Sequence, residues 1–155
     1  MKRLESFRKK VSPVARCERG LAVVEFAVLV PLLVLILFGI ADFGLAMNSY
    51  NNQTQLANEG ARYAAVNRVP SGSSLASYIK SQGDTDQIRN DSQVCVKLLG
   101  SNKVGQPVEV TVSLPFDWAV GSMPIIGTLP KPTIVGSAVM RMEQPAGDGI
   151  IGCTA

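Results

Sequence analysis

The stretch that decides the fold is residues 21–41, which read LAVVEFAVLVPLLVLILFGIA and carry a single charge, at Glu25. As an α-helix this run would be about 31 Å long at ~1.5 Å per residue, which matches the ~30 Å hydrocarbon core of a bilayer. Pro31 lies inside the run, where we expect it to kink the helix rather than end it. The sequence therefore predicts a retained transmembrane helix that crosses the membrane once.

The charges on the two sides of this run predict its orientation. Residues 1–20 hold seven Lys/Arg against two Glu, a net charge of +5, and the remainder holds eight Lys/Arg against ten Asp/Glu, a net charge of −2. Basic residues beside an apolar span mark its cytoplasmic side, so the chain beyond about residue 45 should be exported. A nucleic-acid patch or a cleaved secretory signal are the alternatives, but the apolar run is long and Leu45-Ala46-Met47 is a poor cleavage site.

The helical pattern continues past the membrane to about Val66. Residues recur at steps of four and three, as on one face of a helix: Phe43, Met47, Tyr50, Thr54, Ala57, Ala61 and Ala64. Four small residues, Ala57, Gly60, Ala61 and Ala64, would let another backbone approach closely. We therefore expect this part of the helix to pack against a sheet or against a parallel helix.

The remaining sequence predicts a small antiparallel sheet. A break at residues 70–74 precedes a short helix near 75–80 and a polar loop at 83–92. Apolar residues alternate with polar ones at 94–98 and 108–114, and a third strand-like run covers 133–142. Residues 115–132 are too irregular for a helix, and the glycine-rich tail would be flexible unless Cys153 holds it. The expected fold class is α+β: a long N-terminal helix packed on a sheet of about three strands.

The three cysteines divide between the two sides of the membrane. Cys17 precedes the span, whereas Cys95 and Cys153 follow it and would reach an oxidising compartment. An exported pair is more often a disulfide than two free thiols, so we expect these two to pair. The alternative, in which Cys95 is a small buried apolar residue, stays open.

The composition argues against catalysis. The chain has no histidine, which removes the commonest general base and the commonest metal ligand. No cysteine spacing suits zinc, no glycine loop suits a phosphate, and Asp84, Asp86 and Asp91 read as a solvated loop rather than a calcium site. We expect no catalytic residues, no metal and no cofactor, and no nucleic-acid partner.

The start of the apolar run carries the candidate functional residues. Cleavage after Gly20 would make Leu21 the first residue and Glu25 the fifth residue of a new chain. A carboxylate within a membrane favours an opposite charge, and the new ammonium of Leu21, of the same or a neighbouring subunit, is the natural partner. Gly20 could instead be a simple helix-start residue, and Glu25 could reach the interface. Asp42 is expected to set the outer membrane–water boundary, and Trp118 to anchor the core or a loop.

These residues form a recognisable pattern. The stretches RGLAVVEFA (19–27), PLL (31–33) and FGIADFG (38–44) resemble the TadE-like family. The stretch ANEGARYAA (57–65) resembles the second block of that family, and AVMRME (138–143) is similar to its closing strand.

The resemblance implies a minor pilin, or pseudopilin, of the tight-adherence branch of type IV pilus machines, which build Flp-type adhesion pili. It implies cleavage between Gly20 and Leu21 by an aspartyl prepilin peptidase, and an assembly role for Glu25. Other pilins, the inner-membrane assembly platform and the membrane would be its partners. The expected organisation is a leader at 1–20 that is removed, a transmembrane helix at 21–44 in the bacterial inner membrane and an exported head at 45–155. The alternatives are a membrane-anchored periplasmic binding module and a membrane-tethered enzyme.

Overall fold

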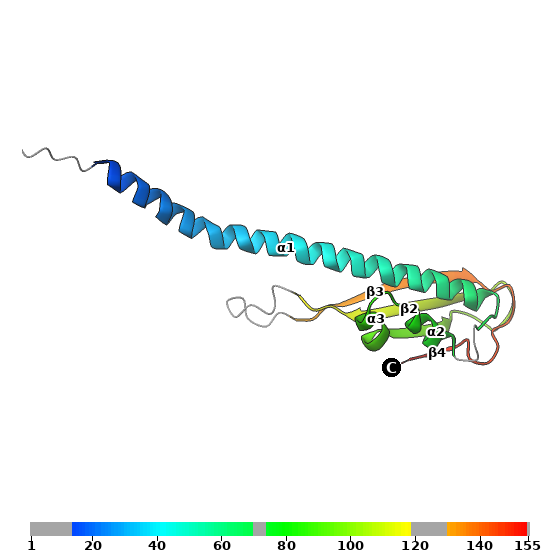
Figure 1. The fold of residues 1–155 in the computed structure, drawn as a ribbon. Helices are drawn as coiled ribbons and strands as arrows, with labels where there is room; N and C mark the ends of the chain where they lie inside the picture. Colours follow the sequence, from blue (N-terminus) through cyan, green and yellow to red (C-terminus); the bar gives the residue numbers. More distant parts are fainter. Residues whose placement is uncertain (1–13, 70–73, 119–129, 155) are drawn as a thin grey trace, which may run out of the picture. The chain divides into compact units, whose positions relative to one another are not determined.

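A computed structural model describes residues 14–69, 74–118 and 130–154, with the backbone alone for 14–19. The chain divides into two compact units, Met1–Gly39 and Ile40–Ala155, and the long helix α1 (Val14–Ala65) belongs to both (Figure 1). The sequence predicted a start near Leu21, and the helix begins seven residues earlier. Gly20 does not stop it, because one glycine in a helix costs only about 1 kcal/mol relative to alanine.

The first unit contains the apolar part of α1, which is apolar on all sides. Its large side chains are exposed all along the helix, from Leu21 (71%) and Phe26 (69%) to Leu37 (57%). A helix that is apolar all round is stable only when it is buried in protein or in lipid. In the described part of the chain, this is the one helix long and apolar enough to cross a membrane.

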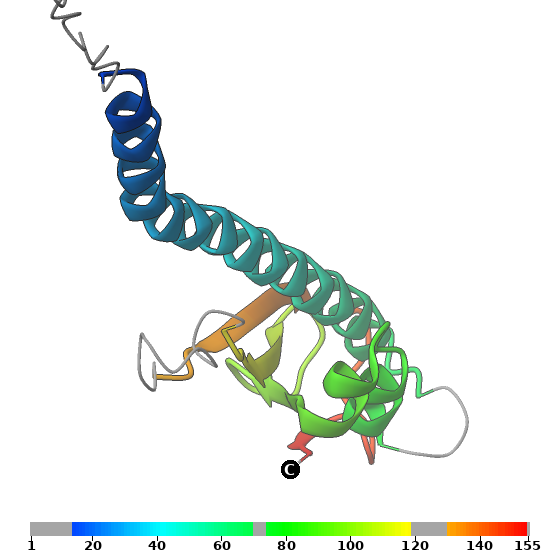
Figure 2. The same cartoon turned by 60° about the vertical axis from the view of Figure 1, so that its left-hand side comes forward.

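The second unit is an α+β head in which α1 covers a four-stranded antiparallel sheet of order β3-β2-β1-β4 (Figures 1 and 2). The strands are β1 (Gln93–Leu98), β2 (Pro107–Pro115), β3 (Thr133–Arg141) and β4 (Gly152–Cys153). The predicted fold class is confirmed, and so are the three longer strands. The fourth strand corrects the expectation of about three: it has two residues, too few for any periodic pattern to reveal it.

Two short helices complete the head. The predicted helix near 75–80 is α2 (Leu75–Ser81), but the polar stretch 83–92, predicted as a loop, contains α3 (Asp86–Asp91). The side chain of Thr85 caps α3 by accepting a hydrogen bond from the backbone N–H of Ile88. Ile88 is the helix's only buried residue, so this six-residue element has no apolar period that a sequence could show.

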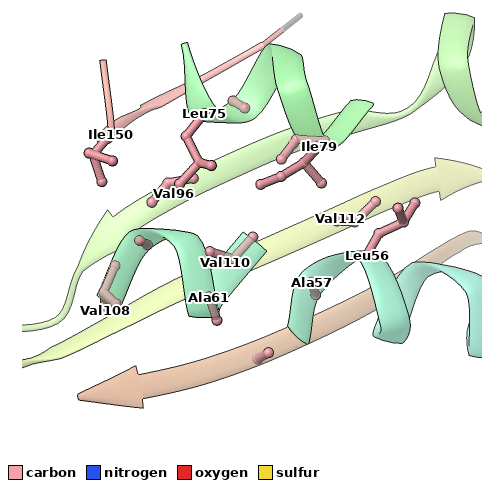
Figure 3. Close-up of a cluster of buried hydrophobic side chains, with 14 of the residues drawn as sticks. Leu56, Ala57, Ala61, Leu75, Ile79, Val96, Val108, Val110, Val112 and Ile150 are labelled. Carbon is pink, nitrogen blue, oxygen red and sulfur yellow. The ribbon is translucent and has the colours of Figure 1, made fainter. Parts of the chain in front are cut away.

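The core lies between the helices and one face of the sheet. Alternate residues of β1 and β2 point inward, and Val94, Val96, Val108, Val110 and Val112 are fully buried. Figure 3 shows α1 and α2 over the same face of the sheet, with Ala57 and Ala61 of α1 near β2 and β3, and Leu75 and Ile79 of α2 near β1. Ile150 of the C-terminal tail closes the core beside Leu75.

Candidate functional site

The predicted cleavage site lies within α1. Gly20 is exposed, and a Cβ placed on it would meet no atom within 4 Å. Leu21 is 71% exposed. The bond between them is therefore not covered by any described part of the chain, and a larger side chain at position 20 would not disturb the fold.

Glu25 lies one turn beyond Leu21 on the same side of the helix. Both residues are exposed, and their spacing of four corresponds to a rise of about 6 Å along the axis. Within the described residues, no hydrogen bond or ion pair engages the Glu25 carboxylate. Its neighbours on every side are apolar. A newly formed chain terminus, another molecule or the membrane interface can supply a partner that the described residues do not.

The four small residues of the outer helix are all buried. Ala57, Ala61 and Ala64 have no exposed surface, and Gly60 is buried beside them. A Cβ on Gly60 would clash with the side chain of Ile79 of α2 and would lie 3.1 Å from Cγ1 of Val110 of β2. The packing partner of this stripe is thus the head's own sheet and α2, not a parallel helix.

A glycine of β3 makes the corresponding close approach from the sheet. A Cβ on Gly136 would lie 2.5 Å from the backbone carbon of Gln53 and 2.5 Å from the backbone nitrogen of Thr54. Gly136 pairs with Val112 of β2, so the contact lies at the centre of the β2–β3 ladder. The absence of a side chain there lets the α1 backbone rest directly on the sheet.

The helical face predicted from the steps of four and three is only partly correct. Ala57, Ala61 and Ala64 face the core, but Phe43, Met47 and Tyr50 are 66%, 46% and 46% exposed. An ideal helix drifts by about 20° per heptad against a strict seven-residue repeat, so three heptads move Phe43 about 60° away from Ala64. The head therefore covers the neighbouring row instead, which includes Gln53, with no exposed surface, and Asp42.

Asp42 follows the apolar run and is 2% exposed. The sequence predicted that Asp42 sets the outer membrane–water boundary of the helix. In the structure Asp42 is buried and takes part in a polar interaction. Burial along α1 thus begins directly where the apolar run ends.

Cys95 and Cys153 are joined by a disulfide, with their Cα atoms 4.1 Å apart. They are directly opposite residues of β1 and β4, and Val96 pairs with Gly152 beside them. The N–H of Thr154 donates to the carbonyl of Val94 at 2.9 Å. The disulfide thus ties the last residues of the tail to the sheet edge.

The rest of the tail is ordered by hydrogen bonds to several elements. The N–H groups of Glu143 and Gln144 both donate to the carbonyl of Ala65, the last residue of α1. Ala146 and Asn102 exchange two hydrogen bonds, of 2.6 and 2.9 Å. These contacts hold residues 143–154 across the end of α1 and the β1–β2 hairpin.

The described residues of the head offer few candidates for a chemical site. The described residues contain no group of three or more His, Cys, Asp or Glu side chains placed to hold a metal. An open groove of about 830 Å³ runs along polar residues, and every described residue that lines it belongs to α1 or to the turn after it: Gln55, Asn58, Glu59, Arg62, Tyr63, Val66 and Arg68. Among the described residues, this lining comes from one side only and does not converge on a small molecule.

Trp118 joins the two chain segments that flank residues 119–129, in line with the loop-anchor role predicted for it. Its indole N–H donates to the carbonyl of Pro130 at 3.0 Å, and its ring meets Phe116 edge to face with centroids 5.2 Å apart. The sequence did not reveal Pro130 as the hydrogen-bond partner of Trp118, because eleven residues without a regular pattern lie between the two.

Together, the apolar exposed helix and the covered sheet define a single-pass membrane-anchored α+β protein. Residues 20–62 match the family model described as TadE-like protein, so this part of the chain is TadE-like, and the resemblance drawn from its motifs is confirmed there. The match includes Gly20, Glu25 and the small residues as far as Ala61, and it ends before the sheet. No curated protein and no solved structure matches the chain.

Proposed function

We propose that this chain is a minor pilin, or pseudopilin, that takes part in assembling a tight-adherence Flp-type pilus, at its initiation or at its tip. The observation that carries the proposal is Glu25, an acid in the apolar part of α1 and inside the TadE-like segment, which has no partner among the described residues. A prepilin peptidase cuts between Gly20 and Leu21. The chain then enters the assembly through its helix, while the head stays on the exported side of the inner membrane.

The charge on Glu25 explains why assembly needs cleavage. An acidic side chain at the centre of a membrane helix costs roughly 2.5–3.5 kcal/mol on insertion scales, and less near the interface. Cleavage places an ammonium on Leu21, one turn away, and opposite charges at that distance attract each other. The pair can form within one chain or between neighbouring subunits. Glu25 can therefore contact a neighbouring subunit through an ammonium that exists only after cleavage.

The head supports a minor rather than a major subunit. Major pilins of these systems are much shorter, whereas this chain carries a folded sheet domain with its own core. That core uses the small residues of the outer helix internally, at Ala57, Gly60, Ala61 and Ala64. Contacts with other pilins and with the assembly platform therefore fall to the apolar part of α1 and to the surface of the head.

The test of processing is the intact mass of the membrane-extracted protein, made in cells with and without a competent prepilin peptidase. We expect a chain that begins at Leu21 when the peptidase is present and a longer chain when it is absent. Recovery of the uncleaved chain with an active peptidase would contradict the proposal. It would leave the alternative, a membrane-anchored binding module that never enters a pilus.

A further inference from the structure

A short stem extends the sheet beyond the end of β2 and before the start of β3. It consists of residues 116–118 and 130–132, and the intervening residues 119–129 lie outside the described part of the chain and outside this inference. The N–H of Phe116 donates to the carbonyl of Pro132 at 2.9 Å, and Asp117 and Lys131 form an ion pair at 2.6 Å. With the hydrogen bond from Trp118 to Pro130, three successive cross-links hold the stem.

The stem lies beside the first turns of α1 after the apolar run. Phe116 and Asp117 line a hollow of about 200 Å³ together with Leu45 and Asn48 of α1. Leu45 follows the last residue of the apolar run by four positions, or about 6 Å along the helix. Figure 1 shows the yellow end of β2 below the cyan turns of α1 that contain these residues.

The opposite end of the sheet is far from that boundary. There, the N–H of Gly105 in the β1–β2 hairpin donates to the carbonyl of Met142, and the next residue, Glu143, donates to Ala65. Ala65 lies 24 residues beyond Ala41, or about 36 Å along the helix. The stem therefore marks the end of the head that is nearer to the end of the apolar run.

The side chains of the stem are of the kinds found where proteins meet lipid headgroups. Tryptophan is enriched at membrane–water interfaces, because its ring is apolar and its N–H is polar. Lys131 is 67% exposed on its side chain, and a lysine can lie along an interface with its ammonium in water. Leu45, 56% exposed, adds an apolar side chain to the surface at this end of the head.

We propose that the stem and Leu45 form a docking surface for the headgroup layer of the membrane that α1 spans. The occupant is the lipid surface itself, because the α1 residues beside the stem, Leu45 and Asn48, lie within two turns of the end of the apolar run. Asp117 and Lys131 neutralise each other, so the surface needs no anionic lipid. The inference depends on the membrane anchor and not on a role in a pilus.

Trp118, the chain's only tryptophan, reports on this contact directly. The full chain is reconstituted in phosphatidylcholine vesicles whose lipids carry a collisional quencher at the headgroup end of the acyl chain. We expect Trp118 emission to be lost in these vesicles relative to unlabelled ones, and to be protected from a water-soluble quencher. A quencher placed at the bilayer centre should have a smaller effect. Unchanged emission with the headgroup-level quencher would overturn the proposal.

A matched control moves the probe to the other end of the head. The double variant Trp118→Phe, Val104→Trp places the only indole in the β1–β2 hairpin, at a residue that is 62% exposed. We expect the lipid quencher to leave this emission unchanged and the water-soluble quencher to reduce it. Equal quenching of both indoles by lipid would also overturn the proposal, because the contact would then not belong to the stem.

Discussion

Removing the disulfide between Cys95 and Cys153 should destabilise the head by about 4 kcal/mol. The two cysteines are 58 residues apart in the sequence. The loop-entropy relation gives about 3 kcal/mol for a 15-residue loop and about 4.7 kcal/mol for a 100-residue loop, so this loop falls near 4 kcal/mol. In the loop-entropy model the effect acts on the unfolded chain, because the covalent bond restricts the conformations of the 58-residue loop there.

The perturbation is the double variant Cys95→Ala, Cys153→Ala in the full chain, and Cys17→Ala is the control because Cys17 lies outside the head. The free energy of unfolding is measured in detergent by denaturant titration, with Trp118 emission as the signal. We expect the double variant to lose about 4 kcal/mol and the control to match the wild type. A loss below about 1 kcal/mol, or two alkylatable thiols in the natively exported head, would refute the reasoning.

Three further predictions concern single side chains. Gly60→Val should destabilise the head by about 1–3 kcal/mol in the same titration, because the new side chain would overlap the side chain of Ile79. Its control, Gly44→Ala, lies where there is open space and should be neutral or stabilising. Ile150→Ala should cost about 2–5 kcal/mol, since Ile150 is 1% exposed; a change below about 0.5 kcal/mol would show that the tail is not part of the core. Gly20→Val should block cleavage while leaving the circular dichroism of the fold unchanged, and N-terminal sequencing of the variant that still begins at Leu21 would contradict the requirement for a small residue before the cut.

The elements that the sequence predicted are those with a long repeating pattern. Alternation of valines with polar residues identified β1 and β2, because one face of each strand is buried and the other is not. The apolar run of α1 was equally plain. The sequence did not predict β4 and α3, which have two and six residues. Strand pairing and helix capping within the folded head define these two elements, and neither is long enough to show a hydrophobic period.

The face of α1 shows a different limit. A sequence pattern gives spacing, but the rotation of a helix on a sheet depends on where close contact is possible. Here Gly136 allows the backbone of α1 to contact the sheet at Gln53 and Thr54. With the helix in this rotation, Phe43 and Met47 are exposed. The small residues nearer the end of the helix were placed correctly, because they lie within eleven residues of that contact, over which the drift is only about 30°.

The candidate site divides in the same way. Glu25 could be singled out from the sequence alone, because a charge in an apolar run is costly wherever the head lies. The pairing of Cys95 with Cys153 followed from the expected compartment. The surroundings of Trp118 and the burial of Asp42 depend on how distant segments meet, and no local pattern records that.

The most direct test of the central claim is the number of pili on cells that carry Glu25→Gln. Glutamine keeps the size of the side chain but cannot pair with the Leu21 ammonium, so we expect piliation and co-purification with the pilin to fall. Cleavage and protein level should stay at wild-type values. Glu25→Asp, which keeps the charge, should retain much of the function, and Glu143→Gln, an exposed glutamate on the head, should have no effect. Normal piliation with Glu25→Gln would contradict the account and would favour a helix that serves only as an anchor.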